Sequence, residues 1–282
     1  MNLLTNKNRF QSYLARDANY PLHGFHLVRP RPWPLLAGFA ALCLTRGGVL
    51  YIHAFQIGFV NLFFGLVLLL FRIYVWWRDV VREACYEGLH TTVVQNNHRL
   101  GMILFIVSEI FFFVAFFWAY FHASIAPAIQ IGASWPPIGI SAFDPWEVPF
   151  LNTIILLLRG CRVTWAHHRV LRGKYKESVI SIIITIFLAL FFTFFQGLEY
   201  VEARFHISDR IYGRTFFIAT GFHGLHVQVG TIFLIVCTIR LINNEFSSDH
   251  HGGIEFAIWY WHFVDVVWLF LFVAVYFWGR IA

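Results

Sequence analysis

Long apolar runs separated by short polar segments make up most of this chain. Each run is long enough to cross a bilayer, because a helix rises about 1.5 Å per residue and the hydrocarbon layer is about 30 Å thick. The pattern therefore predicts an all-α polytopic membrane protein with seven transmembrane helices, at about residues 35–54, 56–76, 101–122, 149–166, 178–199, 215–240 and 256–278.

The lengths of the polar segments predict how these helices are grouped. Almost nothing joins the first two runs, around His53 to Gln56, so they should form a tight antiparallel hairpin. A longer polar segment then separates this hairpin from the other five helices. We therefore expect a two-plus-five bundle in the shape of a V, with a cleft that faces lipid. The predicted parts are an N-terminal segment (1–33), a two-helix hairpin (34–77), a connector (78–100) and a five-helix bundle (101–282).

Basic residues are distributed unevenly between the two sides that an alternating topology defines. Thirteen Lys and Arg fall in segments on the side of the N-terminus and four on the opposite side. Because these residues collect on the cytoplasmic or matrix side, the N-terminus should face that side. The loop from Ser124 to Val148, on the far side, has four prolines and no Lys or Arg. We expect it to form a rigid, non-helical cover.

The composition agrees with a bilayer environment, since 59% of residues are hydrophobic and only 13% are charged. Soluble domains contain about 25% charged residues. The net charge of +6 does not indicate nucleic-acid binding, because the basic residues form short groups between apolar runs. The four cysteines are far apart, so no zinc site, iron–sulfur cluster or disulfide framework is indicated. Residues 1–33 lack the apolar core of a secretory signal, and their prolines oppose an amphipathic targeting helix, which leaves targeting open.

Ionisable side chains inside the apolar runs are the first candidates for chemistry, because they are costly in lipid and normally face protein. His262 and Asp265 lie three residues apart in the last run and share a helix face, which should meet other helices. Glu109, His226 and Asp265 come at similar depth by helical rise. They form either a proton relay or a hydrogen-bonded group that fixes helix packing. Packing is favoured, because a relay also needs groups that lead to both surfaces.

Glu109 should be protonated or paired, with His226 or His223 as its partner. The two histidines, in GFHGLHVQVG, share a helix face, an arrangement that can hold a metal or the edge of a haem. Alternatively, the neighbouring glycines let helices approach closely and the histidines hydrogen-bond across that contact. Since no third ligand of clear spacing is present, we favour an intramembrane polar cluster of Glu109, His223, His226, His262 and Asp265, with no metal ligand and no catalytic residue among them.

Histidines on the N-terminal side of the membrane suggest a second class of function. Membrane di-iron desaturases and hydroxylases gather histidine ligands on one face, so a histidine-ligated di-iron oxygenase or desaturase is the alternative. Their His-x-x-x-His and His-x-x-His-His spacings do not occur here. Ordinary loop histidines at the membrane surface are therefore favoured. The residues concerned are His90, His98, His167, His168, His250 and His251.

Aromatic and charged residues at the end of the second run, WWRDVVRE from Trp76, suit the level of the lipid headgroups. Arg78 and Arg82 lie one helical turn apart. They can hold a lipid phosphate, or they can pair with Asp79 and Glu83. Both interactions are compatible with this position.

Seven segments, taken in order, closely resemble subunit III of cytochrome c oxidase, in its mitochondrial more than its bacterial form. The resemblance runs from about His26 to the end of the chain. The segments are WWRDVVRE from Trp76, GMILFIVSEIFFF from Gly101, WPP at Trp135, VPFLNT from Val148, VTWAHH from Val163, ISDRIYGRTFFIATGFHGLHV from Ile207 and WYWHFVDVVWLFLF from Trp259.

This resemblance implies a non-catalytic core subunit of a terminal oxidase, which stabilises the redox core and supports proton uptake during electron transfer from cytochrome c to oxygen. The chain itself would hold no haem or copper, because these cofactors would lie in partner subunits. Its partners would be subunit I above all, subunit II, accessory subunits and structural phospholipids. The implied location is the mitochondrial inner membrane, or alternatively a bacterial plasma membrane. Glu109 matches the family's intramembrane carboxylate, and the residues expected near lipid headgroups are Trp77, Arg78, Arg82, Glu83, His90 and Arg240.

Four positions depart from the pattern of this family. Arg46, Arg159 and Arg162 replace residues that are usually small or uncharged, and Leu89 stands where His is common. Arginines that face lipid are costly, so these three should snorkel, pair or meet partners in a complex. The stretch before residue 21 is longer than in animal relatives, and no role is assigned to it.

Overall fold

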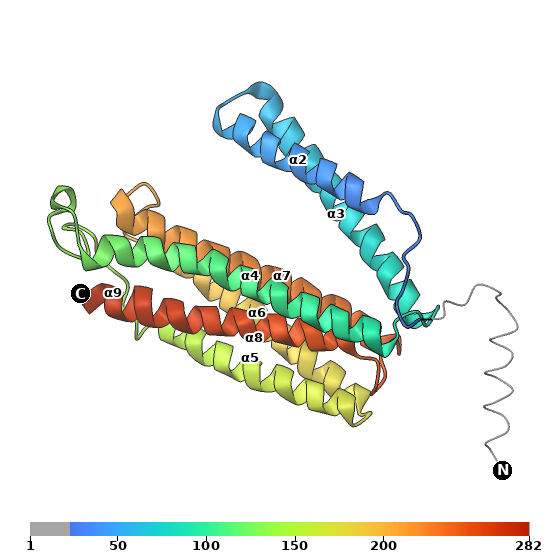
Figure 1. Cartoon of the computed structure of the whole chain (residues 1–282). Helices are drawn as coiled ribbons and strands as arrows, with labels where there is room; N and C mark the ends of the chain where they lie inside the picture. Colours follow the sequence, from blue (N-terminus) through green and yellow to red (C-terminus); the bar gives the residue numbers. More distant parts are fainter. Residues whose placement is uncertain (1–22, 282) are drawn as a thin grey trace, which may run out of the picture. The chain divides into compact units, whose positions relative to one another are not determined.

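The computed structural model describes residues 23–281, and every regular element in this part of the chain is helical. Residues 1–22, which make up most of the predicted N-terminal segment, lie outside the described residues. The long helices are drawn in Figure 1. They are α2 (Trp33–Ile52), α3 (Gln56–Cys85), α4 (Thr92–Ile125), α5 (Val148–Leu171), α6 (Tyr175–Glu202), α7 (Arg210–Ile242) and α8 (Gly252–Leu271), which continues as η2 (Phe272–Trp278) and α9 (Gly279–Ile281).

Each predicted apolar run corresponds to one long helix, but the helices generally extend further than the runs. The largest difference concerns the predicted connector 78–100. There α3 continues to Cys85 and α4 begins at Thr92, so that residues 86–91 alone are non-helical. The reason is that hydropathy marks where a helix leaves lipid rather than where it ends. Polar residues such as Arg82 and Glu83 continue a helix well in water.

Six of the described helices are long and apolar enough to cross a membrane, namely α2, α3, α4, α6, α7 and α8 with its continuation η2. The seventh, α5, has 24 residues and packs against α6 and α8. Its lower hydropathy comes from polar residues that include Arg159 and Arg162. The chain is therefore an all-α polytopic membrane protein of seven helices, as predicted.

The chain divides into two compact units, the first ending at His98 and the second beginning at Arg99. The predicted V-shaped arrangement of its two parts stays a prediction. In the first unit, α2 and α3 form the expected hairpin (Figure 1). A Cβ atom added to Gly47 would stand 2.3 Å from the backbone nitrogen of Leu62. Similar clashes await a Cβ at Gly58 and Gly65, so glycines let the two backbones touch.

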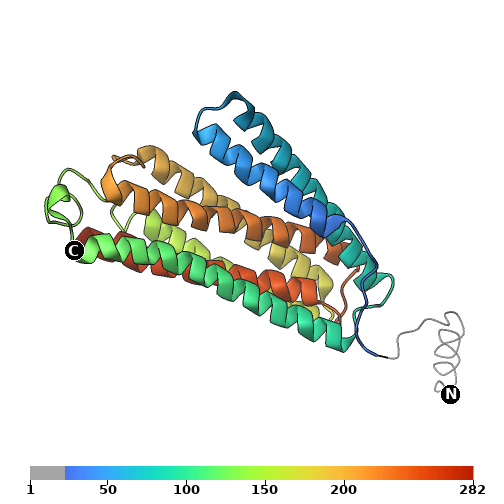
Figure 2. The same cartoon turned by 45° about the horizontal axis from the view of Figure 1, so that its top comes forward.

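The second unit is a bundle of α4, α5, α6, α7 and α8, whose axes run side by side (Figure 2). Aromatic side chains fill its interior, and Trp261, Trp268, Tyr212 and Phe216 are almost fully buried. Many of these rings meet edge to face, as do Phe192 and Trp268, whose centroids are 4.8 Å apart. This geometry is favoured for aromatic pairs, so the packing gives a rigid frame for polar groups.

The loop between α4 and α5 contains one short 3₁₀ turn, η1 (Ile129–Ile131), and is otherwise non-helical. Trp135 in this loop is buried, and its indole N–H donates to the hydroxyl oxygen of Tyr120 at 3.3 Å. Its ring also packs against Tyr212, with centroids 5.3 Å apart. One aromatic side chain therefore anchors this loop to the bundle.

Candidate functional site

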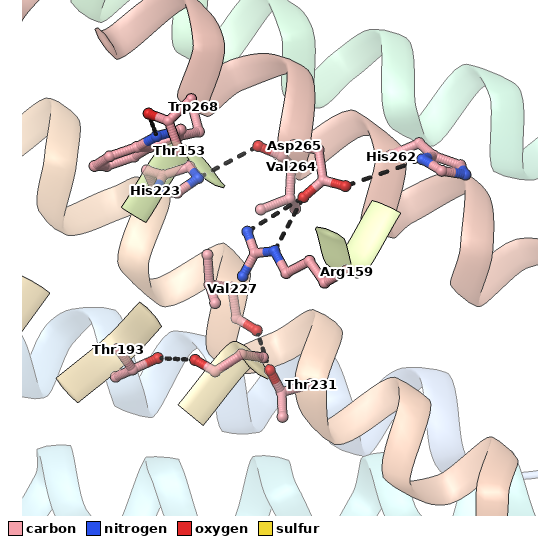
Figure 3. A network of polar contacts seen from close by, with 11 residues as sticks. Thr153, Arg159, Thr193, His223, Val227, Thr231, His262, Val264, Asp265 and Trp268 are labelled. Carbon is pink, nitrogen blue, oxygen red and sulfur yellow. Dashed lines mark hydrogen bonds and ion pairs between the residues drawn. The ribbon is translucent and has the colours of Figure 1, made fainter. Parts of the chain in front are cut away.

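The most deeply buried charged contact of the bundle joins α5 to α8. In Figure 3 the guanidinium of Arg159 faces Oδ1 of Asp265, with both Nε and Nη2 at 3.2 Å. The Arg159 side chain is 0% exposed and that of Asp265 is 9% exposed. The guanidinium carbon also lies 4.6 Å from the ring centre of Phe192 and 4.9 Å from that of Trp261. A carboxylate and two aromatic faces together offset the cost of taking this cation out of water.

Asp265 also approaches His262, which precedes it by one helical turn. Figure 3 shows Asp265 directed toward Arg159 with one carboxylate oxygen and toward His262 with the other, whose distance to Nδ1 is 4.0 Å. Nε2 of His262 lies 3.1 Å from the hydroxyl oxygen of Thr164 on α5. The helix face predicted from His262 and Asp265 thus contacts another helix, although the His262 side chain remains 43% exposed.

His223 lies beside this group but makes a different contact. Its Nε2 is 3.3 Å from the carbonyl oxygen of Val264 on α8, and its ring packs against Trp268. The indole N–H of Trp268 in turn donates to the hydroxyl oxygen of Thr153 at 3.0 Å (Figure 3). Thr153 and Trp268 are both buried, so this hydrogen bond ties α5 to α8 at a second point.

Glu109 on α4 meets His226 on α7, which is one of the two partners proposed from the sequence. Nε2 of His226 lies 2.7 Å from Oε2 of Glu109, and Nδ1 lies 2.6 Å from the carbonyl oxygen of Phe222. Since a carbonyl oxygen can only accept, Nδ1 must carry hydrogen. One proton is then shared between Nε2 and the carboxyl group. The pair is therefore either a neutral acid beside a neutral imidazole or a carboxylate beside an imidazolium.

The predicted five-residue cluster is thus two groups with different partners. Asp265 binds Arg159, whereas Glu109 binds His226. The depth argument could not reveal this, because helical rise fixes how deep a residue lies but not which neighbour it faces. It did not include Arg159, which was expected to snorkel, to pair or to meet a partner subunit and whose side chain is fully buried.

A further buried group was not predicted from the sequence. It lies where α8 continues as the π-helix η2. There Nε2 of Gln196 donates to the hydroxyl oxygen of Tyr276 at 3.3 Å, and Glu199, one turn further along α6, is 1% exposed. The predicted run ends at residue 199, whereas α6 continues to Glu202. The sequence QGLEY, with two polar side chains on one helix face, is the signal that could have revealed this group.

Several residues expected near lipid headgroups are engaged with charged groups of the chain itself. Nη2 of Arg78 lies 2.8 Å from Oδ1 of Asp79, and the indole N–H of Trp33 donates to Oδ2 at 2.7 Å. Glu83 pairs with Arg31, which precedes α2. Ion pairing, one of the two roles considered for the WWRDVVRE segment, is therefore present. Phosphate contact stays a prediction.

Arg240 on α7 is likewise paired. Its Nε lies 2.8 Å from Oε2 of Glu245, and its guanidinium stands 4.2 Å from the ring centre of Phe246. Contact of Arg240 with lipid is untested. The other residues of the predicted lipid-binding set are Trp77 and Arg82, exposed on α3, and His90, partly buried before α4.

The three unusual arginines have different surroundings. Arg159 pairs with Asp265 as described, which is one of the outcomes expected for it. Arg46 on α2 and Arg162 on α5 have exposed side chains. Snorkelling or contact with a partner subunit stays a prediction for these two.

The histidines of the N-terminal side are only partly gathered. The rings of His167 and His251 have centroids 5.5 Å apart. Across the described residues, one set of three side chains brings possible metal-ligand atoms within 4.8 Å of one another, namely His26, Glu83 and His90. The sequence did not indicate this set, because its members are distant from one another along the chain.

Comparison with known proteins gives one consistent result. The chain is 61% identical to cytochrome c oxidase subunit 3 of Prototheca wickerhamii over 257 residues, which cover 91% of this chain and 98% of that protein. It is 59% identical to the Arabidopsis thaliana subunit 3 over 259 residues, covering 92% and 98%. For Oncorhynchus masou the identity is 54% over 257 residues, covering 91% and 98%. The family model of cytochrome c oxidase subunit III matches residues 23–280. The chain therefore belongs to the cytochrome c oxidase subunit III family.

Proposed function

We propose that this chain is a non-catalytic core subunit of cytochrome c oxidase, or complex IV. It stabilises the subunits that hold haem and copper, and it supports proton uptake while electrons pass from cytochrome c to oxygen. One observation carries this proposal: the buried charged groups of the bundle bond to one another, Arg159 to Asp265 and Glu109 to His226. Groups engaged in this way fix the positions of helices. The di-iron alternative finds no support among the relatives, which are named as oxidase subunits.

Selective removal of this subunit from the purified oxidase tests the proposal. We expect the haem and copper content per subunit I to be unchanged and the initial turnover to be largely retained. Activity should then decline faster during sustained turnover than in the complete enzyme. Stoichiometric iron or copper bound to the isolated chain would contradict a non-catalytic role.

We further propose that phospholipid headgroups bind at the predicted lipid set. Arg82 is the strongest candidate in the first unit, because its exposed side chain follows the aromatic pair Trp76 and Trp77. Replacement of Arg82 or Arg240 by Gln should lower the phospholipid that is retained by the purified complex. Arg172, an exposed arginine after α5, gives the matched control for loss of charge. Equal phospholipid content in all variants, measured by mass spectrometry, would refute this assignment.

The proposed location is the mitochondrial inner membrane, with the N-terminus in the matrix and subunit I as the main partner. The excess of Lys and Arg on the N-terminal side supports this orientation. Exposed apolar side chains on all the spanning helices leave surface for lipid or for partner subunits. A tag at the N-terminus should resist protease in mitochondria whose outer membrane has been opened. Crosslinking in the intact complex should give subunit I as the major product. Cleavage of the tag would show that the N-terminus lies on the opposite side of the membrane from the matrix.

A further inference from the structure

The face of α5 that points away from the bundle combines an apolar stripe with an exposed cation. Ile154, Leu158, Cys161 and Trp165 are all exposed on this face. They follow one another at steps of three or four residues, so they form one line along the helix, which we call the α5 stripe. Arg162 is also exposed and lies along one edge of the α5 stripe.

Contacts between α5 and α6 indicate how deep Arg162 lies. Arg169, near the end of α5, pairs with Glu177 in the first turn of α6 at 3.2 Å. These charges mark the level at which the two helices reach the membrane surface. The hydroxyl of Ser181, four residues after Glu177, donates to the backbone carbonyl oxygen of Arg162 at 2.8 Å. By helical rise, the backbone of Arg162 therefore lies about 6–10 Å inside that level.

The tilt of side chains along α5 directs the charge of Arg162 further inward. In an α-helix each Cα–Cβ bond tilts toward the N-terminus, which for α5 lies at the opposite side of the membrane from Arg169. Arg169 follows this tilt, since its guanidinium carbon lies 4.5 Å from the ring centre of Trp165, one turn earlier in the helix. The same tilt directs Arg162 toward the level of Leu158. Snorkelling to the nearer surface is therefore unfavourable for this residue.

The described part of the chain, residues 23–281, does not compensate this charge. The hydrogen bond of Arg162 there involves its backbone carbonyl, and its exposed guanidinium has no ionic partner. A second polar group lies at the other edge of the α5 stripe, where His262 of α8 contacts Thr164 and remains 43% exposed. An unpaired cation is costly in lipid. The α5 stripe therefore needs a cover that supplies negative charge within the membrane.

We propose that a transmembrane helix of another oxidase subunit covers the α5 stripe and carries an Asp or Glu at the level of Arg162. This inference rests on the proposed function, because it requires assembly of the chain into the oxidase. Charge complementarity selects this occupant. Lipid tails carry no charge, lipid phosphates lie at the surface, and a second copy of the chain on the same face would bring a second Arg162. A carboxylate can accept two parallel hydrogen bonds from a guanidinium.

Photo-crosslinking in the intact oxidase identifies the molecule that covers the α5 stripe. Benzoyl-phenylalanine is introduced in place of Leu158, and the adduct is mapped by mass spectrometry after irradiation of the membranes. The major adduct should be a spanning segment of another oxidase subunit, with an Asp or Glu within one helical turn of the attachment point. An adduct formed with lipid alone, or with a second copy of the chain, would overturn the proposal. Because the chain would still copurify with the oxidase, the proposed function would stand in either case.

Charge variants test the carboxylate itself. The Arg162→Gln variant should dissociate from the solubilised oxidase about tenfold faster or more, because the carboxylate of the partner is left buried and unpaired. Arg162→Lys keeps the charge and should have a smaller effect. Arg172→Gln is the matched control, since Arg172 is exposed just after α5, and it should dissociate like the unmodified chain.

Removal of both charges completes the test. Arg162→Gln combined with the amide variant of the crosslinked carboxylate should dissociate more slowly than Arg162→Gln alone, because no buried charge is then left unpaired. Equal dissociation rates for Arg162→Gln and the unmodified chain would overturn the proposed carboxylate. An equal acceleration in Arg172→Gln would overturn it as well, since general loss of positive charge would then explain the effect. Absence of the unmodified chain from the purified oxidase would contradict both this inference and the proposed function.

Discussion

Arg159 on α5 and Asp265 on α8 are joined across the interior of the bundle at 3.2 Å, although 106 residues separate them in the sequence. The pair is enclosed by aromatic rings, and its arginine side chain has no exposure to solvent. Buried ion pairs contribute little net stability against a well-packed apolar pair of the same shape. Loss of one partner is much more damaging, because it leaves the other charge without compensation.

Replacement of Asp265 by Leu should therefore destabilise the subunit by about 3–5 kcal/mol, since it leaves the Arg159 cation buried and unpaired. The temperature at which the chain dissociates from the purified oxidase is the measurement. The double variant Arg159→Met with Asp265→Leu should recover most of the loss. A double variant no more stable than Asp265→Leu would show that the charges do not compensate one another.

The hydrogen bond between Trp268 and Thr153 gives a test of neutral polar packing. Thr153→Val preserves the shape of the side chain but removes the acceptor for a buried indole N–H. We expect a loss of about 1–3 kcal/mol. Thr153→Ser keeps the hydroxyl and is the matched control, so it should lie much closer to the unmodified protein in thermal dissociation. If the Thr153→Val and Thr153→Ser variants dissociated at the same temperature, the hydrogen bond would have no measurable role in stability.

Two adjacent glycines in α2 provide a test of backbone contact between α2 and α3, because only one of them faces α3 closely. A Cβ at Gly47 would fall 2.3 Å from the backbone of Leu62, whereas one at Gly48 would reach only the end of the Leu62 side chain, at 3.7 Å. Gly47→Ala should therefore force α2 and α3 apart and lower the amount of assembled subunit. Gly48→Ala should be neutral or slightly stabilising, because alanine favours helix over glycine by about 1 kcal/mol. Equal amounts of assembled subunit in the Gly47→Ala and Gly48→Ala variants would argue against backbone contact at Gly47.

Asp144 and Arg280 form an ion pair of 2.6 Å that links the loop before α5 to the C-terminal end of the chain. The hydrogen bond from Arg280, followed by one from the backbone N–H of Trp146, lowers the pKa of the Asp144 carboxyl. A lowered pKa means that the contribution to stability is complete above the ordinary value of about 3.9 and is lost as pH falls through the lowered one.

The Arg280→Gln variant should therefore dissociate at a lower temperature than the unmodified subunit by an amount that is constant from about pH 8 to 5. The difference should shrink only in more acidic solution, and it should also shrink in high salt because the pair is exposed. A difference that grew as the pH fell toward 5 would contradict this assignment.

The sequence predicted the membrane helices well because the requirement for long apolar runs is local. It also limited the partner of Glu109 to His226 or His223, since few polar side chains lie at that depth, and the structure places His226 against Glu109. Arg159 and Glu199 were harder to place. Three surroundings were considered for Arg159 and none for Glu199, and both are buried. Their surroundings depend on which face of each helix points into the bundle. Aromatic packing between segments that are distant in the sequence determines that orientation.

The proximity of His26, Glu83 and His90 illustrates the same limit. His26, Glu83 and His90 carry no common spacing, and their proximity depends on the path of the segment before α2. The end of α3 also differs from the end of the predicted run. The helix continues to Cys85, because polar residues such as Arg82 and Glu83 remain helical outside the apolar run. Local chemistry thus fixes which residues are unusual, whereas tertiary structure decides which of them meet.

The pairing of Arg159 with Asp265 also determines how the bundle responds to voltage. A single charge carried across a membrane changes in energy by about 2.3 kcal/mol per 100 mV. Opposite charges held 3.2 Å apart feel almost equal and opposing forces, so the electric field exerts little net force on the pair as a whole. A change in membrane voltage therefore adds little to the energy of moving α5 and α8 together across the bilayer, which would not hold for a lone buried arginine.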